Sequence, residues 1–202
     1  MPSVTNICNM AINHIGTGKP IGNLSEGSVE ARACNTFYEQ SRDELLELFE
    51  WNFAAKIADA QLVEEDPTSE WAYSYLYPSD CVAFRRILSG VTVDHRQSVI
   101  PFRVMNINGA KVILTNQSEA EIEYTMRATD TALFTASFVR ALSLLLASYI
   151  APMLPHGDKL KLRELVLEMH SMALQEAATA NGMEERSDPA PDAESIRERG
   201  TS

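Results

Sequence analysis

Hydrophobic positions near the start of the chain repeat with the period of an α-helix. Five apolar residues, spaced three or four positions apart, form one face: Val4, Ile7, Cys8, Ala11 and Ile15. Ser3 can cap the start of this helix, and Gly16 can end it in a left-handed turn. The glycines and proline of residues 16–24 then predict a loop.

A second helical pattern begins at Ser25 or Ser28 and runs to about Trp51. Its expected inner face consists of Ala31, Cys34, Tyr38, Leu45, Leu48 and Phe49. The charged residues Arg42, Asp43, Glu44, Glu47 and Glu50 are expected on the opposite, exposed side.

The hydrophobic period then changes from that of a helix to that of a β-strand. Ala58, Ala60 and Leu62 alternate with polar neighbours until the run Glu64 to Pro67 breaks the pattern. An aromatic ladder follows on one strand face: Trp71, Tyr73, Tyr75 and Tyr77. Further strand candidates are residues 81–88, 91–93, 99–107, 110–115 and 119–124. We expect one antiparallel sheet over roughly residues 57–129.

Asn108 and Gly109 lie between two of these strands. Both positions of a type I′ turn need positive φ, which Asn and Gly tolerate best. The pair therefore predicts a tight hairpin.

Helical periodicity returns at Asp130 or Thr131 and continues to about Ile150. Its expected core consists of Leu133, Phe134, Phe138, Leu142, Leu145 and Tyr149. The second half is apolar almost all round, which indicates burial on several sides.

Pro152 and Pro155 are expected to end this helix, and Asp158 to cap the next one, which Gly182 closes. The apolar stripe of the last helix is expected to comprise Leu162, Leu165, Val166, Met169, Met172 and Ala173. Residues 183–202 carry six acids and three arginines and almost no apolar side chain, so we expect disorder in isolation.

The order of elements predicts an α+β fold. Residues 1–56 and 130–182 would form a helical bundle, and residues 57–129 an antiparallel β lobe inserted into it. Residues 183–202 would form a flexible acidic tail.

The charge balance limits the classes of function that are possible. The 202 residues carry 28 Asp and Glu against 17 Lys and Arg, a formal net charge of −11. This balance disfavours proteins that bind nucleic acid by neutralising phosphates, or anionic membranes by basic patches. No basic segment followed by an apolar run opens the chain, and residues 141–154 are shorter than the ~20 residues of a membrane span. We expect no signal peptide and synthesis in a reducing cytoplasm.

Catalytic and metal-binding motifs are not apparent. The three cysteines form no C-x-x-C pair and are expected to be buried, reduced thiols. The four histidines lack the spacing of a helical metal site, so surface or capping positions are expected. Lys19 follows a glycine but precedes Pro20, where a phosphate-binding loop needs Ser or Thr. We therefore predict no catalytic residue, metal or cofactor.

Two segments have alternative interpretations. The aromatic ladder could stack single-stranded nucleic acid or sugar, but it lacks interleaved Lys or Arg, which favours sheet core or a protein contact. The tail after residue 182 could be inert, or it could become ordered on a partner.

Several motifs of the first 90 residues occur together in a characteristic order. They are the run from Ile7 to Gly16, the run from Ser28 to Cys34, Tyr38, Arg42 to Leu46, Trp51 to Ala54, Trp71, Tyr73, Tyr75, Pro78 to Cys81, and Arg86-Ile87. In this order and spacing the chain resembles the head-to-tail adaptor proteins of tailed bacteriophages, the tail tubular protein A family. Beyond residue 90 only the order of elements is similar.

The resemblance implies a non-enzymatic protein of the virion, made in the host cytoplasm and located at the head-tail junction. It would assemble with itself as a ring, with twelve copies expected, between the portal protein and the tail nozzle protein. DNA would pass through the lumen as cargo, without sequence-specific binding. No cofactor and no membrane are implied.

The resemblance also suggests contact residues. The helices and the C-terminal segment would contact the portal, with Ile196 as apolar anchor and Arg197 and Arg199 paired with acids. The β lobe would face the nozzle. Candidate nozzle or subunit contacts are Trp71, Tyr73, Tyr75, Asn108 and Gly109.

Two other classes of function compete with this interpretation. One is a small phage-associated hydrolase that degrades peptidoglycan with a pair of carboxylates. The other is a cytoplasmic binding module that uses the aromatic face of its sheet.

Overall fold

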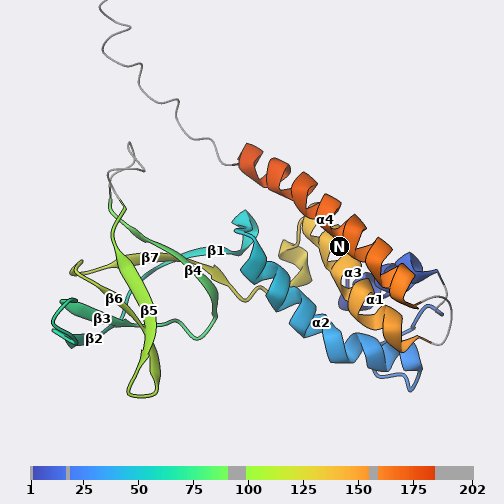
Figure 1. Ribbon diagram of the computed structural model, residues 1–202, viewed down its shortest axis with the longest axis horizontal. Coiled ribbons are helices and arrows are strands. Elements are labelled where there is room, and N and C mark those ends of the chain that lie inside the picture. The colour runs from blue at the N-terminus through green and yellow to red at the C-terminus, as the bar shows by residue number, and fades with distance from the viewer. Residues whose placement is uncertain (1, 17–18, 91–98, 155–158, 185–202) are drawn as a thin grey trace, which may run out of the picture.

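The computed structural model describes residues 2–16, 19–90, 99–154 and 159–184, which adopt an α+β fold (Figure 1). Helices gather at one end of the molecule and strands at the other. The helices are α1 (Val4–Ile15), α2 (Val29–Leu48), α3 (Ala136–Ile150) and α4 (Lys159–Glu184), with short 3₁₀ turns at Asn52–Ala54, Thr131–Leu133 and Ala151–Met153. The strands are β1 (Ala55–Asp59), β2 (Leu62–Glu65), β3 (Tyr73–Leu76), β4 (Cys81–Leu88), β5 (Phe102–Ile107), β6 (Ala110–Thr115) and β7 (Glu121–Met126).

Helix α1 has the bounds and both caps that the sequence predicts. The Ser3 hydroxyl accepts a 3.2 Å hydrogen bond from the Asn6 backbone N–H. Gly16 ends the helix at φ +75°, and its N–H donates to the carbonyl oxygens of Ile12 and Asn13.

Helix α2 begins after the cap residue Ser28 and ends earlier than predicted, at Leu48. The expectation that Leu48 faces the core is wrong, because its side chain is exposed. Trp51 is buried instead, and its indole N–H donates to the Leu45 carbonyl oxygen at 2.9 Å. The expectation that Arg42 is exposed is also wrong. Its side chain is buried, with its charge paired to the Asp43 carboxylate.

Helix α3 starts later than predicted, at Ala136, after a cap by Thr135. Leu133 lies in the preceding 3₁₀ turn and is exposed, so its assignment to the core is wrong. The expected burial of α3 on several sides is confirmed, because α1, α2 and α4 all contact it. The window Ala136–Met153 is long and apolar enough to span a membrane by composition, but 67% of it is buried within the protein, as in a core helix.

Helix α4 packs on α3 through a narrower stripe than predicted. Its described buried residues are Val166, His170, Ala173 and Ala177, whereas Met169 and Met172 are exposed, contrary to prediction. Small side chains and an imidazole, rather than two methionines, fit against α3. Gly182 lies inside the helix, which continues to Glu184. Two of the residues with predicted roles, Pro155 and Asp158, lie outside the described part of the chain, as do the side chains of Leu162 and Leu165.

The strands form two antiparallel sheets rather than the single sheet that was expected. One has the order β1-β7-β4 and the other the order β2-β3-β6-β5. Glu64 and Glu65, expected to break the strand pattern, belong to β2. The hairpin between β5 and β6 is confirmed, because Asn108 and Gly109 adopt φ of 51° and 84°. The strand expected at residues 91–93 lies outside the described residues.

The described residues form two hydrophobic cores. The larger lies among the helices, and the smaller lies between the two sheets, with buried residues from both: Tyr75, Cys81, Ile87, Ile113, Ala120, Ile122 and Tyr124. Because the two sheets pack face to face, each buries the apolar face of the other. A single open sheet would leave its apolar face exposed to water.

Candidate functional site

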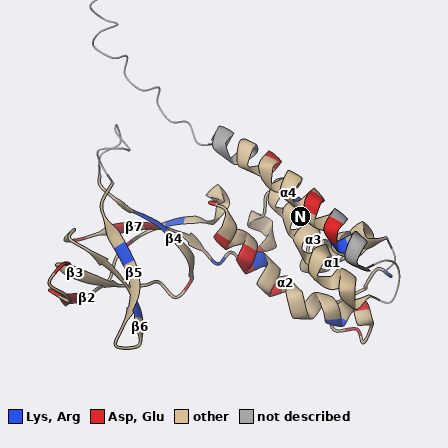
Figure 2. Cartoon of the chain, viewed as in Figure 1, with Lys and Arg blue, Asp and Glu red and all other residues tan. Residues whose placement is uncertain are grey.

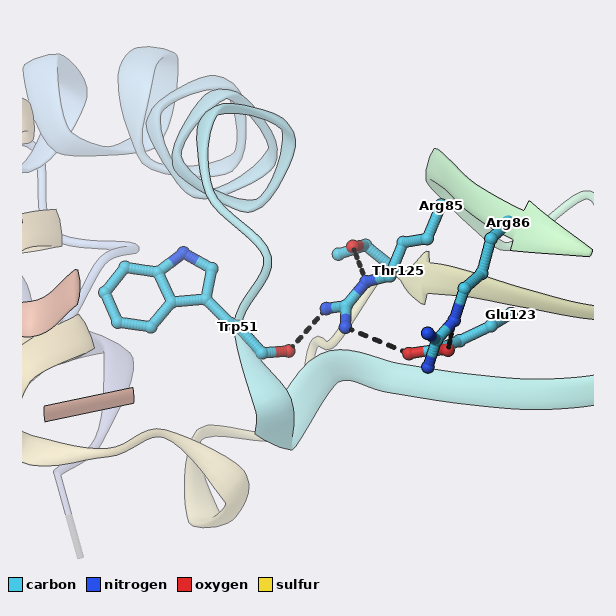
Figure 3. Close-up of polar contacts among 5 residues, drawn as sticks. All are labelled: Trp51, Arg85, Arg86, Glu123 and Thr125. Atoms are coloured by element: carbon cyan, nitrogen blue, oxygen red, sulfur yellow. Dashed lines mark hydrogen bonds and ion pairs between the residues drawn. The ribbon is translucent and has the colours of Figure 1, made fainter. Parts of the chain in front are cut away.

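Polar side chains converge where the helices meet the sheets, and Arg85 of β4 is at the centre (Figure 3). Its side chain is only 7% exposed. One guanidinium nitrogen, Nη2, donates to the Trp51 carbonyl oxygen at 2.7 Å, and Nε donates to the Thr125 hydroxyl at 3.0 Å. Nη1 lies 3.4 Å from Glu123 Oε1. Arg85 thereby joins β4 and β7 to the segment between α2 and β1.

A β-bulge explains how Arg85 reaches this position. The register between β4 and β7 shifts between Phe84 and Arg86, so Arg85 is the extra residue of the bulge. Neighbouring residues of a regular strand point to opposite faces, but the bulge re-aims one of them. As a result Arg85 and Arg86 both bind Glu123, through Oε1 and Oε2 respectively.

A second bulge in β4 adds an apolar contact to the junction. The register also shifts between Cys81 and Ala83, which makes Val82 the extra residue there. Val82 packs against the core of the helices, together with Met126 at the end of β7. Both bulges of β4 thus contribute a side chain that contacts the helical part.

Trp51 provides the helical side of the junction. It is almost completely buried, and its ring lies 4.9 Å from Phe49 and 5.0 Å from Phe138, edge to face in both cases. Because the ring is held in the core and the carbonyl oxygen is held by Arg85, this residue anchors both parts.

Asp43 forms a second polar link. One carboxylate oxygen lies 2.7 Å from Arg42 Nη2 and the other 2.9 Å from Arg127 Nε. Arg127 directly follows β7, so this carboxylate joins the C-terminal half of α2 to the connection between the sheet and α3.

Asp80 forms a third cluster, beside the start of β1. Lys56 Nζ lies 2.7 Å from one of its carboxylate oxygens, and the Tyr124 hydroxyl donates to the other at 2.9 Å. The hydrogen bond from Lys56 is the main reason that the pKa of Asp80 is lowered. The same bond raises the pKa of Lys56, and burial raises that of Tyr124. All charged groups of these three clusters are paired, so the junction is suited to fixing geometry rather than to exchanging protons.

The histidines do not lie where they were expected. His170 is buried, with Nδ1 3.0 Å from the Ala141 carbonyl oxygen, and half-buried His14 lies 3.1 Å from the Ser143 hydroxyl. Burial lowers the pKa of both. A surface position is therefore wrong for these two, because each joins α3 to a neighbouring helix; His95 and His156 lie outside the described residues. Within the described residues, no group of three His, Cys, Asp or Glu side chains is arranged to hold a metal ion.

The three cysteines are free and buried, as predicted. Cys8 of α1 and Cys34 of α2 form a hydrogen-bonded thiol pair, which raises the pKa of Cys8 and lowers that of Cys34. Cys81 lies in the core between the sheets, and burial raises its pKa. These thiols contribute to packing within the two cores.

The predicted contact residues of the β lobe are not equally accessible. Tyr75 is only 2% exposed and its hydroxyl donates to the Gln117 carbonyl oxygen at 2.9 Å, so in this chain it belongs to the core between the sheets. Tyr73 lies beside it, with ring centroids 6.3 Å apart, and is half-buried, as is Trp71. Asn108 and Gly109 are exposed at the tip of the β5–β6 hairpin.

The predicted portal-contact residues, Ile196, Arg197 and Arg199, lie outside the described residues.

Sequence reasoning missed the junction. Arg85 and Arg86 are adjacent in the sequence, but their charge alone does not indicate a structural role. Two adjacent arginines within a strand, opposite a strand with alternating Glu residues, were the available signal. The bulge that brings both to Glu123 is not visible in the sequence.

Comparison with protein-family models and with curated proteins finds no match for this chain.

Proposed function

We propose that this chain is a structural protein of the virion, an adaptor that forms a ring between the portal and the tail nozzle and encloses the DNA channel. The observation that carries the proposal is the Arg85 junction, which fixes a β lobe to a set of helices. A connector binds one partner at each end and must hold the two in a fixed geometry. A buried guanidinium bound to three groups on both sides of the junction suits that requirement.

The order of elements and the motifs of the first 90 residues support the same proposal. Two helices precede the strands and two follow them, as in the adaptor family that the chain resembles. The helices and residues 183–202, with Ile196, Arg197 and Arg199, are the proposed portal side. The lobe, with Trp71, Tyr73 and the Asn108-Gly109 turn, is the proposed nozzle or subunit side.

The net charge suits a channel through which DNA moves. Twelve copies, each with a net charge of −11, would carry a total charge of roughly −130. Acidic residues are spread over helices and strands (Figure 2). An acidic lining repels phosphates, so DNA can slide without binding.

Co-assembly with the portal protein of the same phage tests the proposal. Mass photometry of the mixture should show a portal complex heavier by a whole number of chains, with twelve expected. Ile196→Asp should weaken this complex, whereas Thr201→Asp in the same segment should not. A mixture that contains only free portal and free chain would contradict the adaptor function.

A peptidoglycan zymogram separates the adaptor from the competing hydrolase. The purified chain should leave no cleared band, with lysozyme as the positive control. A cleared band that is lost with one carboxylate variant would favour the hydrolase instead.

A further inference from the structure

The four-stranded sheet carries opposite charges at its two outer strands. Glu64 on β2 pairs with Ser74, Ser74 with Leu114, and Leu114 with Arg103 on β5. These four residues form one straight row across the sheet. Because residues of one row share a face, Glu64 and Arg103 are the two ends of that row on the same face.

Both end residues are accessible. Glu64 and Arg103 are exposed, and neither forms an ion pair with another residue in the described part of the chain. Figure 2 shows the acidic β2 and the basic band on β5 at opposite edges of this sheet.

The two strands are also open at their outer edges. Among the described residues β2 pairs only with β3, and β5 pairs only with β6. Each therefore presents backbone N–H and C=O groups to which another strand can add. β2 and β5 run antiparallel to each other within the sheet, since three antiparallel pairings separate them.

We propose that β5 of one copy of this chain adds to β2 of the next, so that the sheet continues from copy to copy. Antiparallel alternation is preserved across this contact. Continuing the rows places Arg103 of the second copy directly opposite Glu64 of the first, as a cross-strand ion pair.

The neighbouring row fits the same contact, with Val63 as the extra residue of a bulge in β2 between the two rows. Leu62 on β2 and Val104 on β5 are the ends of the row that passes through Tyr75 and Ile113. Leu62 is an exposed apolar side chain, so the contact would cover it with a second apolar residue. An edge strand with exposed Leu62 and Val63 is otherwise prone to unspecific pairing.

The contact uses different surfaces on the two copies, so it generates a closed ring or an open filament rather than a dimer. It deepens the proposed function and rests on it, because it names the subunit contact of the ring. The occupant of the β2 edge is a second copy of this chain, selected by the complementary charge of β5.

Charge reversal tests the ion pair. Glu64→Arg and Arg103→Glu should each weaken self-association, seen by sedimentation velocity and in portal-bound rings, by about tenfold. The double variant Glu64→Arg with Arg103→Glu should restore it. Lys111→Glu is the matched control, because Lys111 is exposed on the inner strand β6. Equal assembly of all four variants and the original chain would overturn the proposal.

Cysteine cross-linking tests the register. Glu64→Cys combined with Arg103→Cys should form disulfide-linked ladders of chains under oxidation, because directly opposite Cβ atoms lie ~5 Å apart. Glu64→Cys with Asn106→Cys, displaced by about 10 Å along β5, should cross-link much less. The native cysteines are buried, and oxidation of the original chain in parallel shows whether they form any cross-link themselves. No ladder at high concentration and none on the portal would exclude this pairing.

The two proposals can fail separately. Portal rings that form equally well with Arg103→Glu and yield no ladder would refute edge pairing and leave the adaptor function standing. A ladder in solution without any portal association would refute the adaptor function and leave edge pairing standing.

Discussion

The Arg85 guanidinium donates a 2.7 Å hydrogen bond to the backbone carbonyl oxygen of Trp51, across the junction between the sheets and the helices. The tryptophan ring lies in the helical core, while the arginine belongs to a strand of the lobe. A main-chain acceptor cannot be removed by substitution at position 51, so the arginine is the residue through which the junction can be tested.

Arg85→Ala should destabilise the chain by about 2–4 kcal/mol, because it leaves the Trp51 carbonyl oxygen and part of Glu123 without a partner in a buried site. Denaturant unfolding monitored by tryptophan fluorescence measures the loss. Arg86→Ala is the matched control: its side chain is 49% exposed, so its loss should cost at most about 1 kcal/mol. An equal loss of unfolding free energy in the two variants would show that Arg85 does not stabilise the junction more than its exposed neighbour Arg86 does.

Phe138→Ala should cost about 3–5 kcal/mol, because its ring is fully buried against Trp51, Phe53 and Phe134. Leu133→Ala should stay within about 1 kcal/mol, since Leu133 is exposed in the 3₁₀ turn. Thermal or urea unfolding of both variants checks the contrast. A large loss from Leu133→Ala would instead support the core position that its sequence pattern predicts.

Gly109→Ala should destabilise the β5–β6 hairpin by about 1–2 kcal/mol, because Gly109 adopts φ +84° and an L-residue is strained there. A Cβ atom added at this position would meet no atom within 4 Å, so the cost is one of backbone conformation and not of collision. Gly27→Ala is the control, since its φ lies outside the left-handed region and its Cβ would also meet nothing within 4 Å. Unfolding by urea compares them, and an equal response would contradict the turn geometry.

Stability should fall as pH drops below about 6.5, partly because of His170 and His14. Burial lowers the pKa of both below the ordinary value of about 6.5, so the unfolded chain binds more protons in this window. The free energy of unfolding therefore rises with pH up to about that ordinary value and then levels off.

His170→Asn should flatten this dependence, since an asparagine amide can donate to the Ala141 carbonyl oxygen but does not titrate. Urea unfolding at several pH values is the measurement. His14→Gln, combined with it, should flatten the slope further. An unchanged slope in the double variant would mean that these imidazoles are not protonated on unfolding.

Local signals predicted much of the fold. The caps Ser3 and Gly16 and the Asn108-Gly109 turn follow from the effect of each residue on its own backbone, and the bounds of β4 match the predicted residues 81–88. Helix ends were less predictable. Leu48 and Leu133 continue the apolar period of their helices, yet α2 ends at Leu48 with Phe49 as its C-cap, and α3 starts only after Thr135.

The candidate site was hardly predictable, because its parts are distant in sequence. Arg85 lies 34 residues from Trp51 and 38 from Glu123, and only the bulge in β4 brings them together. The row that joins Glu64 to Arg103 likewise depends on strand order, which no single segment specifies.

By itself the sequence determined the α+β order of elements, the acidic charge and the local caps and turns, because these depend on neighbours a few residues apart. The tertiary structure alone decided that the strands divide into two sheets, that Arg42 and His170 are buried, and that Arg85 fastens the lobe to the helices. The physical reason is that burial and ion pairing depend on which distant surfaces meet. Opposite charges and apolar faces can determine which helices and strands pack together only after these elements have formed.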